Sequence, residues 1–402
     1  MSDVSTPVDV RDEDAFDVES MAIWLRANAS DAGGLHETPT VRQFSGGASN
    51  LTYLLQYPGG RELILRRPPG GTKARGAHDM GREHNIQAAL RPAFPKVAPM
   101  VAYCDDESVI GSEFYVMERI PGTILRREIP ADLRLDADAV DRLCRNAIDT
   151  LVELHRVDPS AVGLAGLGKG EGYVARQVGG WSARYRAART PDVGDFEATM
   201  AWLDGHQPDD IAQVLIHNDF RFDNLVLSPE DPTRVVGVLD WEMATIGDPL
   251  MDLASGLAYW AQADDPAPFL AMRRQPTNAP GMWRRAQVVE HYCAAMGFTM
   301  DPERWRFYDV FGGFRLAVIA QQIYYRFFHG QTTNPMYGEF VSIVRFLDAK
   351  CAELIAAQGD SSFLDADADA DADESSSVGA QATGEDGANA EADATGEGGT
   401  EA

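Results

Sequence analysis

The sequence contains few cysteines, and it has no long uninterrupted apolar segment. Its four cysteines lie dozens of residues apart without a C-x-x-C pair, so local spacing predicts buried thiols rather than a zinc site or a disulfide framework. No stretch approaches the roughly 18 uncharged apolar residues that a membrane-spanning helix requires. The acidic start of the chain lacks the apolar segment of a secretory signal. We therefore predict a soluble, cytoplasmic protein with no membrane partner.

Basic residues are scarce, and lysine is almost absent. The 402 residues include 62 acids against 35 bases, of which only four are lysine, and the formal net charge is -27. Such a chain repels nucleic acid at long range, so we expect no nucleic-acid partner. The excess of acids is typical of proteins from a high-salt cytoplasm. A GC-rich genome, which favours Arg, Ala, Gly and Asp codons, predicts the same composition equally well.

Composition divides the chain into four parts. Residues 360–402 contain 13 acids and no lysine or arginine, which predicts a disordered acidic tail. The acidic segment 1–14 is predicted to be flexible. Between them, residues 15–120 are rich in short β-type runs and residues 121–359 are mostly helical in pattern.

Apolar periodicity predicts an α+β chain. The first unit is expected to form helices at 15–30 and 78–90 and strands at 40–44, 51–57, 62–67 and 113–120. The second unit is expected to form helices at 136–157, 252–260, 284–296 and 307–328, which surround short strands at 214–216, 225–227 and 235–239.

The short strands of the second unit flank the most informative motif. The chain reads I-H-N-D-F-R-F-D-N-L from residue 216, and L-D-W-E follows from residue 239. The spacing H-x-D-x-x-x-x-N, followed by a strand that ends in Asp, is the arrangement used for phosphoryl transfer from ATP. It predicts Asp219 as the base that takes the proton of the acceptor hydroxyl. Asn224 and Asp240 are predicted to bind Mg²⁺, which prefers carboxylate and amide oxygens.

Two neighbours of the predicted base have different expected roles. Arg221 lies two residues after Asp219, where a cation stabilises the oxygens of the transferring phosphoryl group. A surface charge is the alternative for Arg221. His217 is expected to brace the loop.

Further along, Asp248 and Asp252 are expected to cap a helix and brace the loop rather than to bind metal.

Several segments together resemble a known family. They read F-S-G-G-A-S-N-L-T-Y-L-L, L-I-L-R-R-P-P-G-G, G-R-E-H, F-Y-V-M-E-R-I-P-G, E-L-H-R-V-D, H-N-D-F-R-F-D-N-L and D-W-E-M-A-T-I-G-D-P-L-M-D-L-A. Over residues 41–346 the chain resembles the aminoglycoside phosphotransferase and choline-kinase-like family, in particular the kinase-like domain fused to some acyl-CoA dehydrogenases. This resemblance implies a bilobal protein-kinase-like fold, with a smaller antiparallel β-sheet lobe carrying a helix and a larger, mostly α-helical lobe.

The resemblance also implies a nucleotide site in the smaller lobe. A small-residue turn is expected to contact the phosphates through Ser45, Gly46, Gly47, Ser49 and Asn50. By itself, such a glycine-rich turn is more often simply a hairpin turn.

A basic residue paired with a helix glutamate is implied to hold the α- and β-phosphates of ATP. Alignment to L-I-L-R gives Arg66 and Glu83, where many relatives have lysine in place of arginine. Arg67 is the competing candidate, since strand alternation lets only one of the two reach the nucleotide. The hinge is implied to bind adenine through the Glu118 carbonyl and the Ile120 amide.

The acceptor is expected to be a small hydroxyl compound, because neither D-F-G nor A-P-E follows the motif. An anionic acceptor is suggested by basic residues interleaved with Tyr173, Trp181 and Tyr185, namely Lys169, Arg176, Arg184, Arg186 and Arg189. Solvated helix charges and a buried aromatic stripe are the ordinary alternatives. The helix at 307–329 is expected to contribute polar and aromatic side chains to an amphipathic cavity.

The predicted function is an ATP-dependent O-phosphotransferase acting on a small metabolite, such as a carboxylate-bearing or hydroxyacyl compound. Choline-like and sugar acceptors remain open. The resemblance further implies a functional link to acyl-CoA metabolism. The alternative is a nucleotide-binding pseudokinase that acts as an adaptor, which the arginine at position 66 favours.

Overall fold

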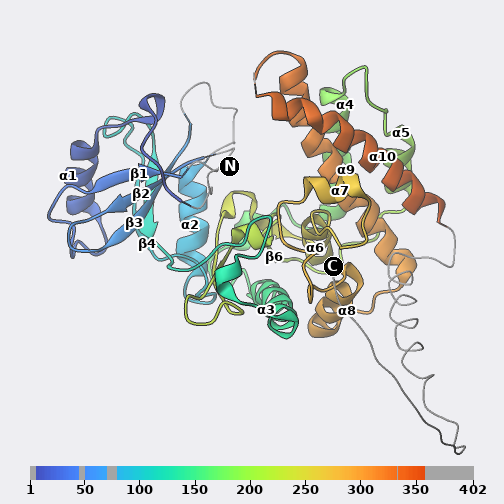
Figure 1. The fold of residues 1–402 in the computed structure, drawn as a ribbon, viewed down its shortest axis with the longest axis horizontal. Helices are drawn as coiled ribbons and strands as arrows, with labels where there is room; N and C mark the ends of the chain where they lie inside the picture. Colours follow the sequence, from blue (N-terminus) through green and yellow to red (C-terminus); the bar gives the residue numbers. More distant parts are fainter. Residues whose placement is uncertain (1–5, 45–49, 70–78, 333, 358–402) are drawn as a thin grey trace, which may run out of the picture.

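The computed structural model describes residues 6–44, 50–69, 79–332 and 334–357. They form a smaller β-sheet lobe and a larger helical lobe, which lie side by side in Figure 1. The sheet is antiparallel with strand order β1-β2-β3-β5-β4. Its elements are α1 (Val18–Asn28), β1 (Thr40–Gln43), β2 (Leu51–Gln56), β3 (Glu62–Arg67), α2 (Met80–Leu90), β4 (Met100–Cys104) and β5 (Phe114–Glu118). The predicted bilobal α+β fold is confirmed.

Strand alternation sends side chains of the sheet to two separate cores. Leu55 and Leu65 pack with Met21 of α1 on one face. Leu54 and Ile64, their neighbours along the same strands, pack with Met80 of α2 on the other face. The sheet is therefore covered on both faces, and α2 lies on the side of the helical lobe (Figure 1).

Val8 and Asp14, which precede α1, contact the sheet, although a flexible segment was expected at 1–14; residues 1–5 of that segment lie outside the described residues. Val8 pairs with Gln43 through hydrogen bonds of 2.8 Å in both directions. The carbonyl of Asp14 accepts hydrogen bonds from the Tyr53 hydroxyl and the Arg67 guanidinium. The first contact extends the edge strand β1, and the other two satisfy side chains of β2 and β3, which acidic composition alone does not reveal. The predicted tail at 360–402 lies outside the described residues.

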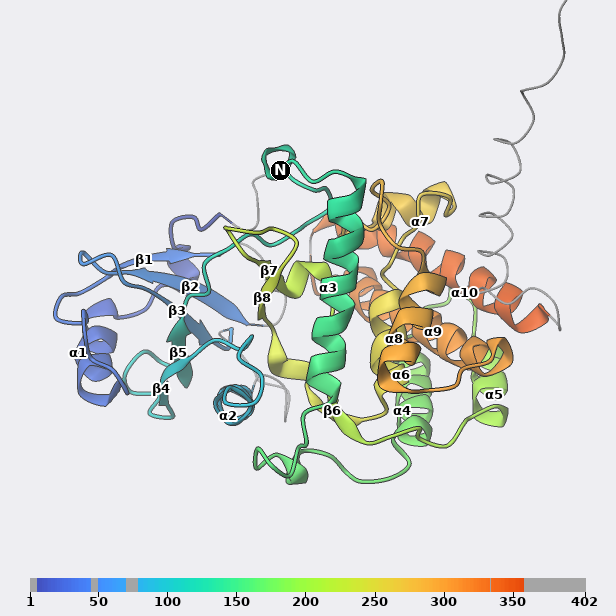
Figure 2. The same cartoon turned by 90° about the horizontal axis from the view of Figure 1, so that it is seen from below.

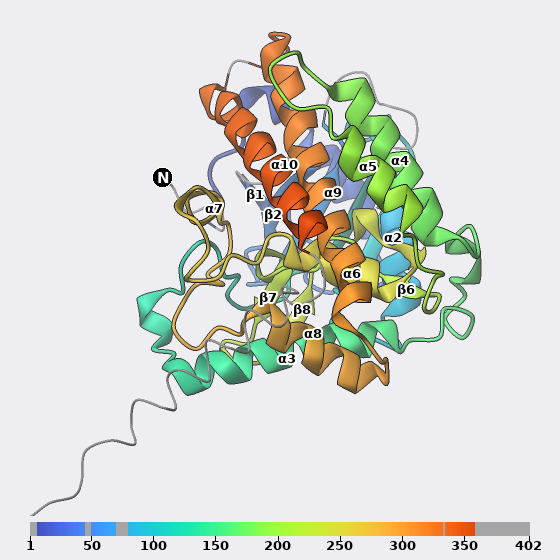
Figure 3. The same cartoon turned by 90° about the vertical axis from the view of Figure 1, so that its right-hand side faces the viewer.

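The larger lobe is built from helices around two small antiparallel strand pairs. The helices are α3 (Ala137–His155), α4 (Tyr173–Ala188), α5 (Glu197–Gly205), α6 (Pro249–Leu257), α7 (Ala267–Met272), α8 (Arg285–Met296), α9 (Pro302–Phe328) and α10 (Phe340–Ala356). The pairs are β6 (Val214–Ile216) with β9 (Thr245–Gly247), and β7 (Leu225–Leu227) with β8 (Val235–Val238). Figure 2 shows α3 alongside β7 and β8, and Figure 3 shows α9 beside α10. None of the helices in the described part of the chain combines the length and apolar character needed to cross a bilayer.

Close packing fixes α9 against α6. Gly312 faces the backbone of Ala254, and a Cβ at position 312 would lie 2.7 Å from the Ala254 carbonyl oxygen. Only glycine allows this approach without a shift of backbone. The contact holds the middle of α9 against α6, whose Gly256 in turn faces the carbonyl of Phe220 in the H-x-D segment.

The lobes are joined by backbone hydrogen bonds as well as by the chain itself. Thr123 forms a two-way bridge with Leu227, at 3.0 and 2.8 Å. Gly122 precedes it with φ 151°, and a Cβ there would lie 2.1 Å from the Leu227 carbonyl oxygen. The amide of Val238 donates to the carbonyl of Lys96 over 2.7 Å. The end of the sheet lobe is thus anchored to the β7–β8 hairpin that flanks the predicted site.

Candidate active site

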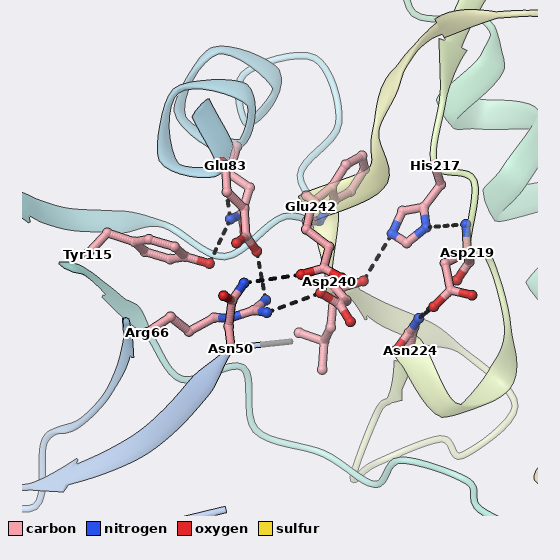
Figure 4. Close-up of polar contacts among 12 residues, drawn as sticks. Asn50, Arg66, Glu83, Tyr115, His217, Asp219, Asn224, Asp240 and Glu242 are labelled. Carbon is pink, nitrogen blue, oxygen red and sulfur yellow. Dashed lines mark hydrogen bonds and ion pairs between the residues drawn. The ribbon is translucent and has the colours of Figure 1, made fainter. Parts of the chain in front are cut away.

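The loop from His217 to Asn224, between β6 and β7, brings the predicted base and a predicted metal ligand together (Figure 4). The Asn224 amide Nδ2 donates to Asp219 Oδ2 over 2.8 Å and to the Asp219 carbonyl over 2.9 Å. This leaves the Asn224 side-chain oxygen for another partner. Asp219 is half-buried, so its carboxylate is fixed in direction and still accessible.

His217 ties this loop to the strand that precedes Asp240. Its Nδ1 accepts from the Asp219 amide at 3.2 Å, which assigns the proton to Nε2. Nε2 then donates to the Leu239 carbonyl at 2.9 Å. The imidazole is fully buried and packs edge-on against Trp241. These contacts agree with the bracing role expected for His217.

Asp252 also holds this loop through hydrogen bonds to its backbone, as expected. Its Oδ2 accepts from the His217 amide at 2.7 Å, and its Oδ1 accepts from the Asn218 amide at 2.6 Å. His155 Nε2 approaches Oδ2 at 3.1 Å. Burial tends to raise the pKa of Asp252, but these hydrogen bonds outweigh it and hold the pKa below its ordinary value. The carboxylate is therefore an ionised internal brace.

Asp248 caps α6, the second role expected in this segment. Its Oδ1 accepts from the amides of Leu250 and Met251, and its Oδ2 accepts from the Ile211 amide at 2.7 Å. Burial raises the pKa of Asp248 to about 6, although the three amides work in the opposite direction.

Arg221 is directed at the predicted base rather than into solvent. Its Nε lies 2.9 Å from Asp219 Oδ1, and its Nη2 lies 3.1 Å from Oδ2 of the same carboxylate. Asp223 lies 3.5 Å away, and the Tyr259 ring lies under the guanidinium at 4.4 Å. Burial opposes the charged form, but Asp219 and Asp223 raise the pKa of Arg221 above its ordinary value. A plain surface charge is excluded by these contacts.

Asp240 faces the sheet lobe and meets Arg66. It adopts the left-handed conformation at φ 68°, which turns the chain sharply after β8. Its Oδ1 lies 3.1 Å from Arg66 Nη2, and Arg66 Nη1 lies 2.6 Å from Glu83 Oε1. Three predicted site residues from β3, α2 and the segment after β8 therefore converge (Figure 4).

Arg67 points to the opposite face of the sheet. Its Nη2 donates to the Tyr53 hydroxyl at 3.0 Å and to the Asp14 carbonyl at 2.6 Å, and the guanidinium lies over the Phe16 ring. Of the two candidate arginines, Arg66 is the one that lies beside Asp240.

The predicted phosphate turn is only partly described. Ser45, Gly46, Gly47 and Ser49 lie outside the described residues. Asn50, at the end of that turn, donates from Nδ2 to Glu242 Oε2 over 3.1 Å. This contact joins the turn to the D-W-E segment across the two lobes (Figure 4).

Two residues at this junction were missed by sequence reasoning. Glu242 lies in D-W-E, where only the Asp was assigned a role. Arg82 donates to the carbonyls of Glu242, at 2.9 Å, and Ala244. Arg82 is part of the G-R-E-H segment, but no spacing rule indicates that its side chain would reach another lobe.

The predicted hinge residues lie at the end of β5. The Glu118 side chain pairs with Arg61, and the Glu118 amide donates to the Pro99 carbonyl at 2.9 Å. Ile120 packs on the core that includes Leu54.

The acceptor-side expectations need correction in two respects. Tyr173, Trp181 and Tyr185 are buried core residues, and the five basic residues beside them are exposed. Arg186 is paired with Glu197 at 2.7 Å. On α9, Gln321 is fully buried, with Nε2 bonded to the Ala188 carbonyl and Thr190. Arg186 is thus paired at the surface and Gln321 is bonded inside the lobe, so neither side chain lines a cavity.

Comparison with known proteins gives the family of the chain. Residues 40–289 match the model of the phosphotransferase enzyme family. The chain belongs to this family. It is 35% identical, over 82% of its length, to human acyl-CoA dehydrogenase family member 11, of which it spans 42%.

Solved structures place the phosphotransferase chain among kinase-like folds. A candidate aminoglycoside phosphotransferase from Ralstonia eutropha JMP134 is 30% identical with a TM-score of 0.71, covering 85% of this chain and 98% of its own. Choline kinase from Cryptosporidium parvum has a TM-score of 0.56 at 12% identity, covering 84% of this chain and 95% of its own. At that identity the second likeness concerns the fold alone.

Proposed function

We propose that this phosphotransferase moves the γ-phosphoryl group of ATP to a hydroxyl of a small metabolite. The observation that carries the proposal is the contact of Asn224 with Asp219, together with the link through His217 from Asp219 to the segment of Asp240, which pairs with Arg66 of the sheet lobe. Asn224 contacts Asp219 at 2.8 Å, and His217 links Asp219 to the residue before Asp240. A base and two hard oxygen ligands are the groups that phosphoryl transfer requires.

Asp219 acts as the base. Its carboxylate takes the proton of the acceptor hydroxyl while that oxygen bonds to the γ-phosphorus and the bond to the β-phosphate oxygen breaks. Arg221 and the Asn224 amide hold both carboxylate oxygens, which fixes the orientation of the carboxylate. Arg221 also places positive charge where the phosphoryl oxygens gain negative charge.

Asn224 and Asp240 fit a magnesium ion. Asn224 uses its nitrogen for Asp219, so its side-chain oxygen is the atom available as a ligand. The Asp240 side chain remains about one third exposed, at 35%. An amide oxygen and a carboxylate match the preference of Mg²⁺. When bound, the ion supplies positive charge against the phosphate oxygens of ATP.

Arg66 is proposed to hold phosphate oxygens. Glu83 fixes one arm of its guanidinium, while the other arm points to Asp240. A planar guanidinium binds phosphate through two donors, unlike the point charge of lysine. Asn50 and the turn before it, with the hinge at Glu118 and Ile120, complete the proposed ATP site.

The acceptor is proposed to be a hydroxylated acyl or carboxylate-bearing metabolite. Supporting this is the similarity to proteins named acyl-CoA dehydrogenase family members 10 and 11. Since the chain spans less than half of those relatives, the link to acyl-CoA metabolism is part of this proposal and not a property of the matched segment.

Phosphorus NMR of ATP and Mg²⁺ with pooled hydroxylated metabolites tests the function. The wild type should produce a new phosphomonoester signal that Asp219→Ala does not produce, although the variant still binds ATP. Asp209→Asn, a change of an exposed carboxylate outside the site, is the matched control and should retain activity. Transfer by Asp219→Ala at the wild-type rate would refute the assignment.

One contact favours a second candidate, a nucleotide-binding adaptor without transferase activity. Arg66 occupies one oxygen of Asp240, the residue that is needed for metal. An adaptor would bind ATP equally well with and without Mg²⁺, and no pool would yield a phosphomonoester.

A further inference from the structure

Arg315 is a buried cation next to the predicted base. It lies in the middle of α9 and is only 5% exposed. Its Nη2 donates to the carbonyl of Asn218 over 2.9 Å. Asn218 immediately precedes Asp219, so this guanidinium is in contact with the backbone that positions the base.

One aromatic ring flanks Arg315. Its Cζ lies 5.1 Å from the centroid of the Trp181 ring, and the Cζ of Arg184 lies 4.6 Å from the same ring. The Tyr173 hydroxyl bonds the side chain of Asn218 at 3.1 Å, and Asn218 is the residue whose carbonyl Arg315 contacts. Arg315 and Tyr173 therefore both hold the residue that precedes the predicted base.

The charge of Arg315 has no ionic partner within the described part of the protein. No Asp or Glu oxygen there lies within 4.0 Å of its nitrogens, and Asn218 is the one hydrogen-bond acceptor it contacts. Other buried arginines are better satisfied. Arg66 and Arg285 each pair with carboxylates, and Arg67 makes three hydrogen bonds to Tyr53 and Asp14.

Burial of a cation without an anion is unfavourable, because the lost hydration is repaid only by a partner of opposite charge. Cation–π contact with Trp181 offsets part of this cost. A planar guanidinium with remaining donors is suited to a carboxylate, which can accept two parallel hydrogen bonds.

We propose that Arg315 binds the carboxylate of the acceptor and so directs its hydroxyl to Asp219. This inference rests on the proposed phosphotransferase function and specifies its substrate class as hydroxy acids. Because Arg315 contacts the residue adjacent to the base, short acids, in which few bonds separate carboxylate from hydroxyl, fit best. The exposed basic residues of α4 are not needed for this recognition.

Calorimetric titration tests binding apart from transfer. Glycerate and 3-hydroxybutyrate are titrated into protein that holds a non-hydrolysable ATP analogue with Mg²⁺, and glycerol and butane-1,3-diol serve as neutral counterparts. Arg315→Met should weaken binding of the acids about tenfold or more, as loss of a charge-assisted hydrogen bond predicts, and leave the neutral compounds unaffected. Arg184→Met, which removes the other cation on Trp181, is the matched control and should bind like the wild type.

Steady-state kinetics supplies the second readout. Arg315→Met should raise KM for the acids more than it lowers kcat, and Arg315→Lys should recover part of the affinity. If the Met variant fails to fold, the Lys variant is used instead, because lysine keeps the positive charge and loses the paired donors of the guanidinium. Arg315→Lys should lower the affinity for the acids and leave the affinity for the neutral compounds unchanged.

Two results would overturn the inference. One is an equal effect of Arg315→Met on acids and neutral compounds, which indicates a purely structural role through Asn218. The other is no measurable binding of either acid to the wild type. Acid binding that depends on Arg315 without any phosphoryl transfer would instead support this site and refute the proposed enzymatic function.

Discussion

Asp240 Oδ1 lies 3.1 Å from Arg66 Nη2, although the two residues belong to different lobes and are 174 positions apart. Glu83 holds the other arm of the same guanidinium at 2.6 Å. The proposed metal ligand and the proposed phosphate ligand are thus paired with each other. Binding of ATP with Mg²⁺ would replace this ion pair with contacts of each residue to its own ligand.

Two substitutions of Arg66 should separate the effect of its positive charge on activity from the effect of its planar shape. Arg66→Met removes the cation and leaves Glu83 buried without its partner, so we expect at least about a hundredfold loss in kcat/KM for ATP. Arg66→Lys should lose less, about tenfold, because a point charge replaces the fork. Initial rates against ATP concentration measure both. Arg67→Lys, on the opposite face, is the control; an equal loss there would contradict the assignment of Arg66.

Asp252→Asn should destabilise the protein. The carboxylate accepts hydrogen bonds from two backbone amides and His155 in a fully buried site, and an amide nitrogen would face one of these donors. The free energy of unfolding should fall by about 3 kcal/mol. Denaturant titration followed by tryptophan fluorescence measures it. A change below about 0.5 kcal/mol would show that the loop does not depend on this brace.

The motif and the α+β character could be predicted from the sequence because both depend on local signals, whereas the bilobal fold was implied by the family resemblance. The H-x-D-x-x-x-x-N spacing fixes residue types that the chemistry requires, and alternation placed Arg66 and Arg67 on opposite faces. Strand β9 was missed because its three residues are too few to show an alternation of apolar and polar side chains. It forms only by pairing with β6. Strand β4, at the edge of the sheet beside β5, was also missed.

Contacts between distant segments could not be predicted in the same way. Periodicity predicted the helix that forms most of α9, but the approach of Gly312 to Ala254 decides which of its residues meets the H-x-D loop. The helix was assigned as a whole to an amphipathic cavity, and the contact of its Arg315 with Asn218 was not foreseen. Likewise, Asn50 and Glu242 meet only when the two lobes are assembled.

Stability should depend on pH through Asp248. Its pKa is about 6 in the folded protein and 3.8 ordinarily, so between these values the folded state binds more protons than the unfolded state. Stability from this group is therefore fully present below about pH 4 and is lost as pH rises toward 6. The loss amounts to about 2–3 kcal/mol. The free energy of unfolding, measured between about pH 4 and 6, should fall with rising pH more steeply for the wild type than for Asp248→Asn. An equal pH dependence of the two proteins would contradict the raised pKa.

Gly312 and Gly179 should respond in opposite directions to alanine, although both lie inside helices. A Cβ at 312 would lie 2.7 Å from the Ala254 carbonyl, and backbone cannot yield cheaply, so Gly312→Ala should lower the free energy of unfolding by about 1–3 kcal/mol. Gly179 in α4 has open space around its Cβ position, so Gly179→Ala should raise stability by about 0.5–1 kcal/mol. Thermal and denaturant unfolding of both variants measure the contrast.

Because Gly312 also sets the position of Arg315, its variant should weaken hydroxy-acid binding while the Gly179 variant does not. Stabilisation by alanine at both positions would show that α6 and α9 do not pack at this distance.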